Sequence, residues 1–177
     1  MGELTATSGV TATYGTARNQ GTSTYGPEVV RLLSDVGIDL FDWQAMILDE
    51  WLEVDDHDRL TRQTAALVAP RRNGKSWLII ARVLAGMLWL GERRVTYSSH
   101  RMDTSREIFD SLREVLAHPQ LEPLVEKVVL AHGKEAIELV NGSRFTVRTR
   151  TGHGGRGLET DLLIFDEALI LDPESIA

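Results

Sequence analysis

The segment from Ala69 to Ser76 has the residue types that bind a phosphate chain, and it reads Ala-Pro-Arg-Arg-Asn-Gly-Lys-Ser. Glycine, lysine and a hydroxyl residue in succession suit a loop whose backbone N–H groups surround a phosphate. The Lys75 ammonium would reach the β- and γ-phosphate oxygens, and the Ser76 hydroxyl would bind Mg²⁺. Ala69 stands where such loops usually carry their first glycine. The segment therefore predicts a phosphate-binding loop that departs from the usual pattern at one position.

Two adjacent carboxylates, Asp166 and Glu167, follow the four apolar residues Leu162 to Phe165. At the end of a strand, the first acid would lie beside a nucleotide-bound metal ion and the second would polarise a water molecule for attack on the γ-phosphate. The alternative is a buried strand that ends in two solvated acids. Because a phosphate loop and an acidic pair occur in the order that nucleotide hydrolysis needs, we predict a site for ATP and Mg²⁺.

Strands and helices must position these two groups. The apolar run from Ala65 to Ala69 is predicted to be a strand buried on both faces, and residues 75–90 are apolar nearly all round, as in a packed helix. The last strand is predicted at Asp161 to Asp166. Both chemical groups would then lie at the carboxyl ends of strands in one sheet.

The remaining elements complete an α/β plan. Thr104 and Glu107 form a capping-box pattern ahead of a helix, and Asn141-Gly142 is a strong hairpin signal. This order predicts an α/β fold: a P-loop NTPase of the additional-strand, RecA-like type, with a mainly parallel sheet flanked by helices, plus a β-hairpin. The other predicted strands are Arg94 to Ser98, Lys127 to Leu130, Glu135 to Val140 and Arg144 to Thr149.

The N-terminal residues differ in composition from the rest. Residues 1–26 are rich in Thr, Ser, Gly and Ala and are predicted to form a flexible arm, followed by a P-loop ATPase domain over residues 27–177. A short amphipathic helix is predicted to begin at Pro27, and Asp42 is predicted to cap a second helix.

Composition excludes several classes of protein. The chain has 177 residues, a formal net charge of −7, no cysteine and 42% hydrophobic residues. Without cysteine there is no disulfide framework, zinc-thiolate site or thiol nucleophile, and no apolar run is long enough for a membrane span. The five histidines have no ligand spacing, so we predict no zinc site.

Four segments together resemble the N-terminal ATPase domain of the terminase large subunit of tailed bacteriophages. Leu40 to Leu48 is similar to the family's adenine-recognition segment, and Pro70 to Ser76 resembles its arginine-containing Walker A motif. Arg156-Gly157 followed by Asp161 to Ala168 resembles its Arg-Gly segment and Walker B motif.

The resemblance implies roles for individual residues. Arg71 falls where the family carries an arginine that senses the γ-phosphate, and Arg156 is a candidate arginine finger for a neighbouring subunit. The expected catalytic residues are thus Glu167, Lys75, Arg71 and Arg156, and the expected metal ligands are Ser76 and Asp166. The expected nucleotide-binding residues are Trp43, Gln44, Pro70, Arg71, Arg72, Asn73, Gly74, Lys75, Ser76 and Asp166.

The resemblance also implies a function. Such a domain hydrolyses ATP to drive double-stranded viral DNA into a procapsid, as a homo-oligomeric ring on the portal protein, with a small terminase subunit delivering the DNA. Its location is the host cytoplasm, with no membrane partner. The family's coupling motif and nuclease domain lie beyond Walker B, so we expect a chain ending at Ala177 to be a fragment or a truncated frame, without nuclease activity of its own.

Alternatives stay open for the function and for two groups of arginines. A helicase-like DNA translocase shares the glutamine segment and both Walker motifs, and an inactive nucleotide-binding module would bind without hydrolysis. Arg71 and Arg72 are alternatively solvated loop charges. Finally, Arg144, Thr146, Arg148 and Arg150 alternate onto one strand face, which we interpret as a solvated face rather than a DNA contact.

Overall fold

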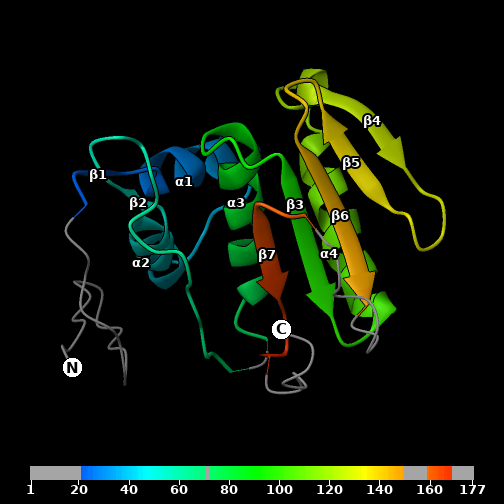
Figure 1. Ribbon diagram of the computed structural model, residues 1–177, viewed down its shortest axis with the longest axis horizontal. Coiled ribbons are helices and arrows are strands. Elements are labelled where there is room, and N and C mark those ends of the chain that lie inside the picture. Colours follow the sequence, from blue (N-terminus) through cyan, green and yellow to red (C-terminus); the bar gives the residue numbers. More distant parts are fainter. Residues whose placement is uncertain (1–20, 71, 150–158, 169–177) are drawn as a thin grey trace. The chain divides into compact units, whose positions relative to one another are not determined.

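The computed structural model describes residues 21–70, 72–149 and 159–168 (Figure 1). The chain forms two compact units, residues 1–85 (unit 1) and residues 86–177 (unit 2). The boundary between them falls within helix α3, Lys75–Leu88. The described residues therefore confirm an α/β fold. The five-stranded sheet lies entirely in unit 2, and the two-stranded sheet lies in unit 1.

Unit 1 is built around two short helices. Helices α1, Gly26–Asp35, and α2, Asp42–Trp51, lie against each other, and a two-stranded antiparallel sheet joins β1, Ser23–Thr24, to β2, Glu53–Val54. Apolar side chains at helical spacing are buried in both helices, because each helix has one apolar face to remove from water. The fully buried ones are Val29, Leu33 and Leu48, and Leu52, directly after α2, is fully buried as well.

The predicted N-terminal arm contains structured residues at its end. Ser23 and Thr24 pair with β2, and α1 begins at Gly26, one residue before the predicted start at Pro27. A Cβ on Gly26 would lie 2.7 Å from the Cα of Asp49, so glycine permits the close approach of α1 to α2. Residues 1–20 of the predicted arm lie outside the described residues.

The strand predicted at Ala65 to Ala69 is wrong. These residues form no strand, and the Val68 side chain is 97% exposed. A strand is stable only when another strand accepts and donates its backbone hydrogen bonds, and no strand in the described part of the chain pairs with this run. Composition alone therefore gave a misleading prediction here.

Unit 2 contains a five-stranded mixed sheet in the order β4-β5-β6-β3-β7, which Figure 1 shows side by side. Strand β3 is parallel to both β6 and β7, whereas β5 is antiparallel to both β4 and β6. The sheet is therefore mixed: β3, β6 and β7 pair in parallel, as expected, whereas the predicted hairpin adds β5 to the same sheet as an antiparallel strand. The strands are β3 Arg94–Ser99, β4 Val125–Val129, β5 Ala136–Leu139, β6 Arg144–Thr149 and β7 Leu162–Phe165.

Helix α4, Met102–Leu116, packs against β3 and β6. Ile108, Phe109 and Leu112 lie on its buried face. The predicted capping box at Thr104 is wrong, since Arg101 is the N-cap residue and the Ser105 N–H donates to its carbonyl at 3.2 Å. A short 3₁₀ helix, Glu122–Leu124, leads from α4 to β4.

The predicted hairpin at Asn141-Gly142 is confirmed. Gly142 has φ +85°, and the Leu139 N–H donates to the Ser143 carbonyl at 2.8 Å. The Asn141 side chain also donates to the Met87 carbonyl at 2.7 Å, which ties the turn to the end of α3. Within the ranges that the structure describes, no helix has the length and apolar character needed to cross a membrane.

Candidate functional site

The predicted phosphate loop of unit 1 is closed by its own lysine. The Lys75 ammonium donates hydrogen bonds to the carbonyls of Ala69 at 3.1 Å and Pro70 at 2.8 Å. These contacts join the last residue of the loop to its first two residues. A lysine ammonium has three donors, so one more remains for an anionic ligand.

The loop backbone turns sharply before α3. Gly74 has φ +78°, and Arg72 has φ +62°, a left-handed conformation that costs a non-glycine residue about 1–3 kcal/mol. Helix α3 begins at Lys75, as predicted, and the Trp77 N–H donates to the Gly74 carbonyl at 3.1 Å. Strain of this kind persists where the surrounding contacts impose it.

The side chain of Gln44, in helix α2, contacts the loop at Gly74. Its side chain is 1% exposed, its Nε2 donates to the Gly74 carbonyl at 2.7 Å, and its Oε1 accepts the Phe41 N–H at 2.7 Å. A Cβ on Gly74 would lie 2.9 Å from Gln44 Nε2. Glycine is therefore required at position 74 by both the backbone angle and the neighbouring amide.

Asp42 does not cap α2 as predicted. Phe41 is the N-cap residue, and Gln44 reaches back from the third helical position to the Phe41 N–H. The glutamine thus satisfies a helix donor with one atom and holds the phosphate loop with the other. The same side chain that the sequence assigned to nucleotide binding has both its polar atoms engaged within the protein.

An exposed aromatic residue beside the loop is Phe41, not Trp43. The Phe41 side chain is 63% exposed, and its Cε2 would lie 3.7 Å from a Cβ on Gly74. Trp43 is half-buried in α2. The sequence analysis missed Phe41, although a large apolar residue directly before a helix, outside its buried stripe, was an available signal.

The other loop residues are on the surface. Pro70, Arg72, Asn73 and Ser76 are exposed, and Ser76 lies in the first turn of α3. Arg71, Arg150 and Arg156 lie outside the described residues. Unit 1 therefore brings together Gln44, Gly74 and Lys75 of the predicted nucleotide-binding set.

The acidic pair of unit 2 directly follows β7. The Asp166 N–H donates to the Ser98 carbonyl at 3.0 Å, which continues the parallel pairing of β7 with β3. Asp166 Oδ2 accepts the Tyr97 hydroxyl at 2.8 Å, and Oδ1 accepts the Glu167 N–H at 2.8 Å. Glu167 is exposed and has φ +53°. Hydrogen bonds thus hold both oxygens of the Asp166 carboxylate in a fixed direction.

The opposite end of β7 is fixed by Asp161. Its Oδ2 accepts the N–H groups of Arg93 at 2.9 Å and Arg94 at 2.8 Å, and its own N–H donates to the Arg94 carbonyl at 2.8 Å. These bonds set the register of β7 on β3, and the register places Asp166 beside Tyr97.

The arginine face of β6 is solvated, as interpreted from the sequence. Arg144 and Arg148 are exposed, whereas Phe145 and Val147 on the other face are buried. Arg144 forms an ion pair with Glu138, so its charge is compensated within the sheet.

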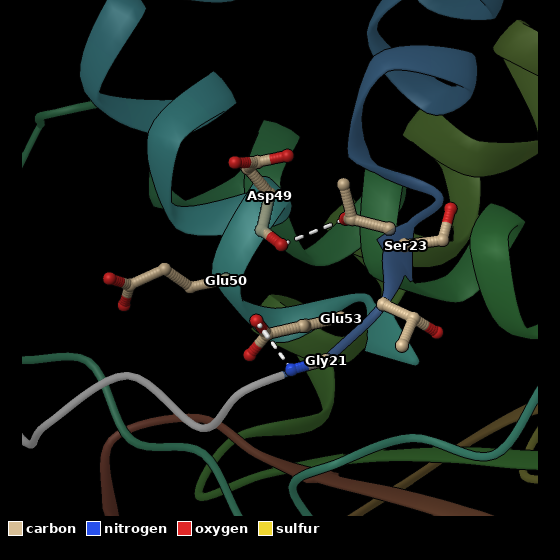
Figure 2. A pocket seen from close by; sticks show the side chains of 7 residues that line it. Gly21, Ser23, Asp49, Glu50 and Glu53 are labelled. Carbon is tan, nitrogen blue, oxygen red and sulfur yellow. Dashed lines mark hydrogen bonds between the residues drawn. The ribbon is translucent and has the colours of Figure 1, made fainter. Parts of the chain in front are cut away.

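A cavity of about 200 Å³ lies between β1, β2 and α2 in unit 1 (Figure 2). Glu53 Oε1 accepts the Gly21 N–H at 3.0 Å, and the Thr24 hydroxyl donates to the Asp49 carbonyl at 2.8 Å. Asp49, Glu50 and Glu53 are acidic, so this lining disfavours a phosphate chain. The cavity contains none of the predicted site residues.

The predicted magnesium site would not be built from protein side chains alone. In the described ranges, no group of three or more His, Asp or Glu residues is arranged to hold a metal ion. Mg²⁺ commonly keeps several water ligands and binds through one or two carboxylates together with substrate phosphates. An oriented carboxylate such as that of Asp166 is chemically suited to this kind of binding.

Comparisons with known proteins give no family assignment. No protein-family model matches this chain, and a search of curated proteins finds no match.

Proposed function

We propose that this chain is the ATP-hydrolysing motor domain of a phage terminase large subunit, which drives double-stranded viral DNA into a procapsid. The observation that best supports the proposal is the loop before α3. Lys75 closes it through two carbonyls, and buried Gln44 braces it at Gly74. A loop preordered in this way can bind a phosphate chain with little further loss of conformational entropy.

In this proposal the residues of unit 1 bind the nucleotide. Lys75 binds the β- and γ-phosphates, with the backbone N–H groups at the start of α3 beside them. Phe41 offers an exposed ring for the adenine, with Gln44 holding that ring's backbone next to the loop. Trp43 frames the same region from α2, and Pro70, Arg72 and Asn73 complete the loop.

The residues of unit 2 serve the hydrolysis step. Asp166, together with Ser76, would hold the Mg²⁺, which offsets the negative charge of the phosphates when bound. Glu167 orients the attacking water and accepts its proton. Arg71 or Arg156 stabilises the charge that develops on the γ-phosphate.

The partners follow from the same proposal. They are double-stranded DNA, the portal protein, the small terminase subunit and further copies of the chain in a ring, all in the host cytoplasm. A helicase-like DNA translocase and an inactive nucleotide-binding module are the two competing functions.

A thermal-shift titration with Mg²⁺ and a slowly hydrolysed ATP analogue tests the nucleotide site. At 100 times its dissociation constant, the ligand should stabilise the wild-type chain by about 2.7 kcal/mol, which raises the melting temperature by several degrees. Lys75→Ala should abolish the shift. Lys134→Ala, which removes an exposed lysine from a loop of unit 2, should retain it. No shift in the wild-type chain contradicts the proposal.

ATP hydrolysis separates the competing functions. A packaging motor should hydrolyse ATP faster with double-stranded DNA and should not separate the strands of a forked duplex. Strand separation supports the helicase-like translocase, and nucleotide binding without hydrolysis supports the inactive module.

A further inference from the structure

Tyr97 has an environment that its place in the core does not by itself explain. The side chain is 0% exposed, and its hydroxyl donates to Asp166 Oδ2 at 2.8 Å. Strand β3 lies between β6 and β7, and Tyr97 pairs in register with Ile164 of β7. Tyr97 and Asp166 are separated by 69 positions in the sequence, so only the parallel pairing of β3 and β7 brings them together.

The Asp166 carboxylate is held at both oxygens. Tyr97 binds Oδ2, the Glu167 N–H binds Oδ1, and the Asp166 N–H is fixed to the Ser98 carbonyl. A carboxylate oxygen has about two lone-pair positions, so accepting a hydrogen bond does not by itself prevent it from coordinating a cation. The contacts therefore fix the direction of the carboxylate.

A phenol is well suited to this task. Its hydroxyl orients a carboxylate without adding a positive charge, whereas lysine or arginine would neutralise the carboxylate and weaken its attraction for a cation. A phenylalanine would fill nearly the same volume but would leave Oδ2 without this donor. The hydroxyl, rather than the ring, is thus the group whose function needs an explanation.

We propose that Tyr97 is a positioning residue that orients Asp166 to receive the divalent cation bound with the nucleotide. The inference rests on the proposed function, since it assigns Asp166 to the metal. The orientation also reaches Glu167, because its N–H donates to Asp166 Oδ1 while its backbone is held at φ +53°. Tyr97 therefore orients Asp166 directly, and Glu167 is linked to the same carboxylate by its own N–H.

The test compares Tyr97→Phe with the wild-type chain, using Mn²⁺ as the probe. Free Mn²⁺ is measured by electron paramagnetic resonance in the presence of the slowly hydrolysed ATP analogue. Loss of an outer-shell partner typically weakens metal binding about tenfold or more, and we expect a loss of about tenfold for Tyr97→Phe. Analogue binding without metal, followed by fluorescence, should stay unchanged.

Tyr25→Phe is the matched control. The Tyr25 hydroxyl donates to Asp58 Oδ1 at 3.4 Å at an exposed position of unit 1, outside the predicted site. This variant loses the same atom and should bind Mn²⁺ like the wild-type chain. Equal Mn²⁺ affinity of Tyr97→Phe and wild type, with an intact nucleotide site, would overturn the role of Tyr97 alone. Absence of nucleotide-dependent Mn²⁺ binding in the wild type would overturn the proposed function and this inference with it.

A second measurement needs no change at Tyr97, in case Tyr97→Phe folds poorly. The chain contains three tyrosines, Tyr14, Tyr25 and Tyr97, which can be replaced by 3-fluorotyrosine. Tyr14→Phe and Tyr25→Phe assign the fluorine resonances by elimination. Adding Mn²⁺ with the ATP analogue should broaden the Tyr97 resonance strongly, and an unbroadened Tyr97 resonance would overturn the inference.

Discussion

The predicted phosphate loop and the acidic pair after β7 are held in place by different kinds of contact. In unit 1, two side chains bind the loop backbone: Gln44 at Gly74, and Lys75 at the loop's first residues. In unit 2, the acids are held by the sheet, since the pairing of β7 with β3 carries Asp166 to Tyr97. The loop therefore depends on a few side chains, whereas the acids depend on strand register.

Both regions nevertheless share one property. Arg72 in the loop and Glu167 in the acidic pair are non-glycine residues with positive φ, and Asp58 is the only other such residue in the described ranges. Strained backbone of this kind is concentrated at functional sites. The two regions thus share a non-glycine residue with positive φ, although different contacts hold them, and mutations in each region can separate those contacts.

The largest effect is expected from Glu167→Gln. If Glu167 accepts the proton of the attacking water, its loss should lower kcat for ATP hydrolysis by about 10²- to 10⁴-fold while nucleotide binding persists. Steady-state hydrolysis and the thermal-shift titration measure the two properties on the same sample. Glu126→Gln, at an exposed position in β4, is the control and should change neither. A Glu167→Gln chain with wild-type kcat contradicts the assigned role.

A smaller effect is expected from Gly74→Ala, which tests the side-chain support of the loop. The new Cβ meets Gln44 Nε2 at 2.9 Å in a residue with φ +78°, so we expect a loss of about 2–4 kcal/mol in the free energy of unfolding. Chemical denaturation measures this loss.

Gly91→Ala is the matched control for that prediction. Gly91 has φ +67° but no atom within 4 Å of the new Cβ, so it carries the backbone cost alone, about 1–2 kcal/mol. The difference between the two variants isolates the contact with Gln44. Equal losses in the free energy of unfolding would mean that the Gln44 side chain moves aside without destabilising the protein and does not brace the loop.

Asp161→Ala tests the support of the acids by the sheet. The substitution removes the acceptor of the Arg93 and Arg94 N–H groups at the start of β7. We expect a loss of about 1–2 kcal/mol in the free energy of unfolding, measured by urea denaturation. Asp56→Ala, at an exposed position of unit 1, should change it little. An Asp161→Ala chain as stable as wild type would show that strand register does not depend on this carboxylate.

The smallest effect concerns a surface turn in unit 1. Hydrogen bonds from the Arg59 side chain, and then from the Arg59 and His57 N–H groups, lower the pKa of Asp55 from 3.8 to about 2. The folded state therefore binds this proton more weakly than the unfolded state. Its stabilising contribution is present above about pH 4 and is lost as the pH falls through about 2.

Melting temperatures of wild type and Asp55→Asn between pH 5 and pH 2 measure this contribution. The wild-type chain should melt slightly higher at pH 5, and the difference should disappear near pH 2. Asp56→Asn is the control, and a constant difference across the pH range would show that the Asp55 proton plays no part.

Much of the fold could be predicted from local patterns. The start of α3 at Lys75, the turn at Asn141-Gly142 and the apolar strand before Asp166 are all confirmed. Each depends on residues within a few positions of one another, so the spacing of residue types is enough to predict it. The strand predicted at Ala65 to Ala69 failed because a strand also needs a partner, and spacing says nothing of partners.

The candidate site also combines features that local sequence predicts with contacts that only the tertiary structure creates. Residue types and order alone predicted a site at the loop, the lysine and the two acids, and this stays a prediction. Tertiary structure decided that Gln44 braces Gly74, that the exposed Phe41 lies nearer to Gly74 than was expected, and that Tyr97 holds Asp166. These contacts join residues 30 to 69 positions apart, and they exist only because helix packing and strand register bring distant side chains within hydrogen-bonding distance.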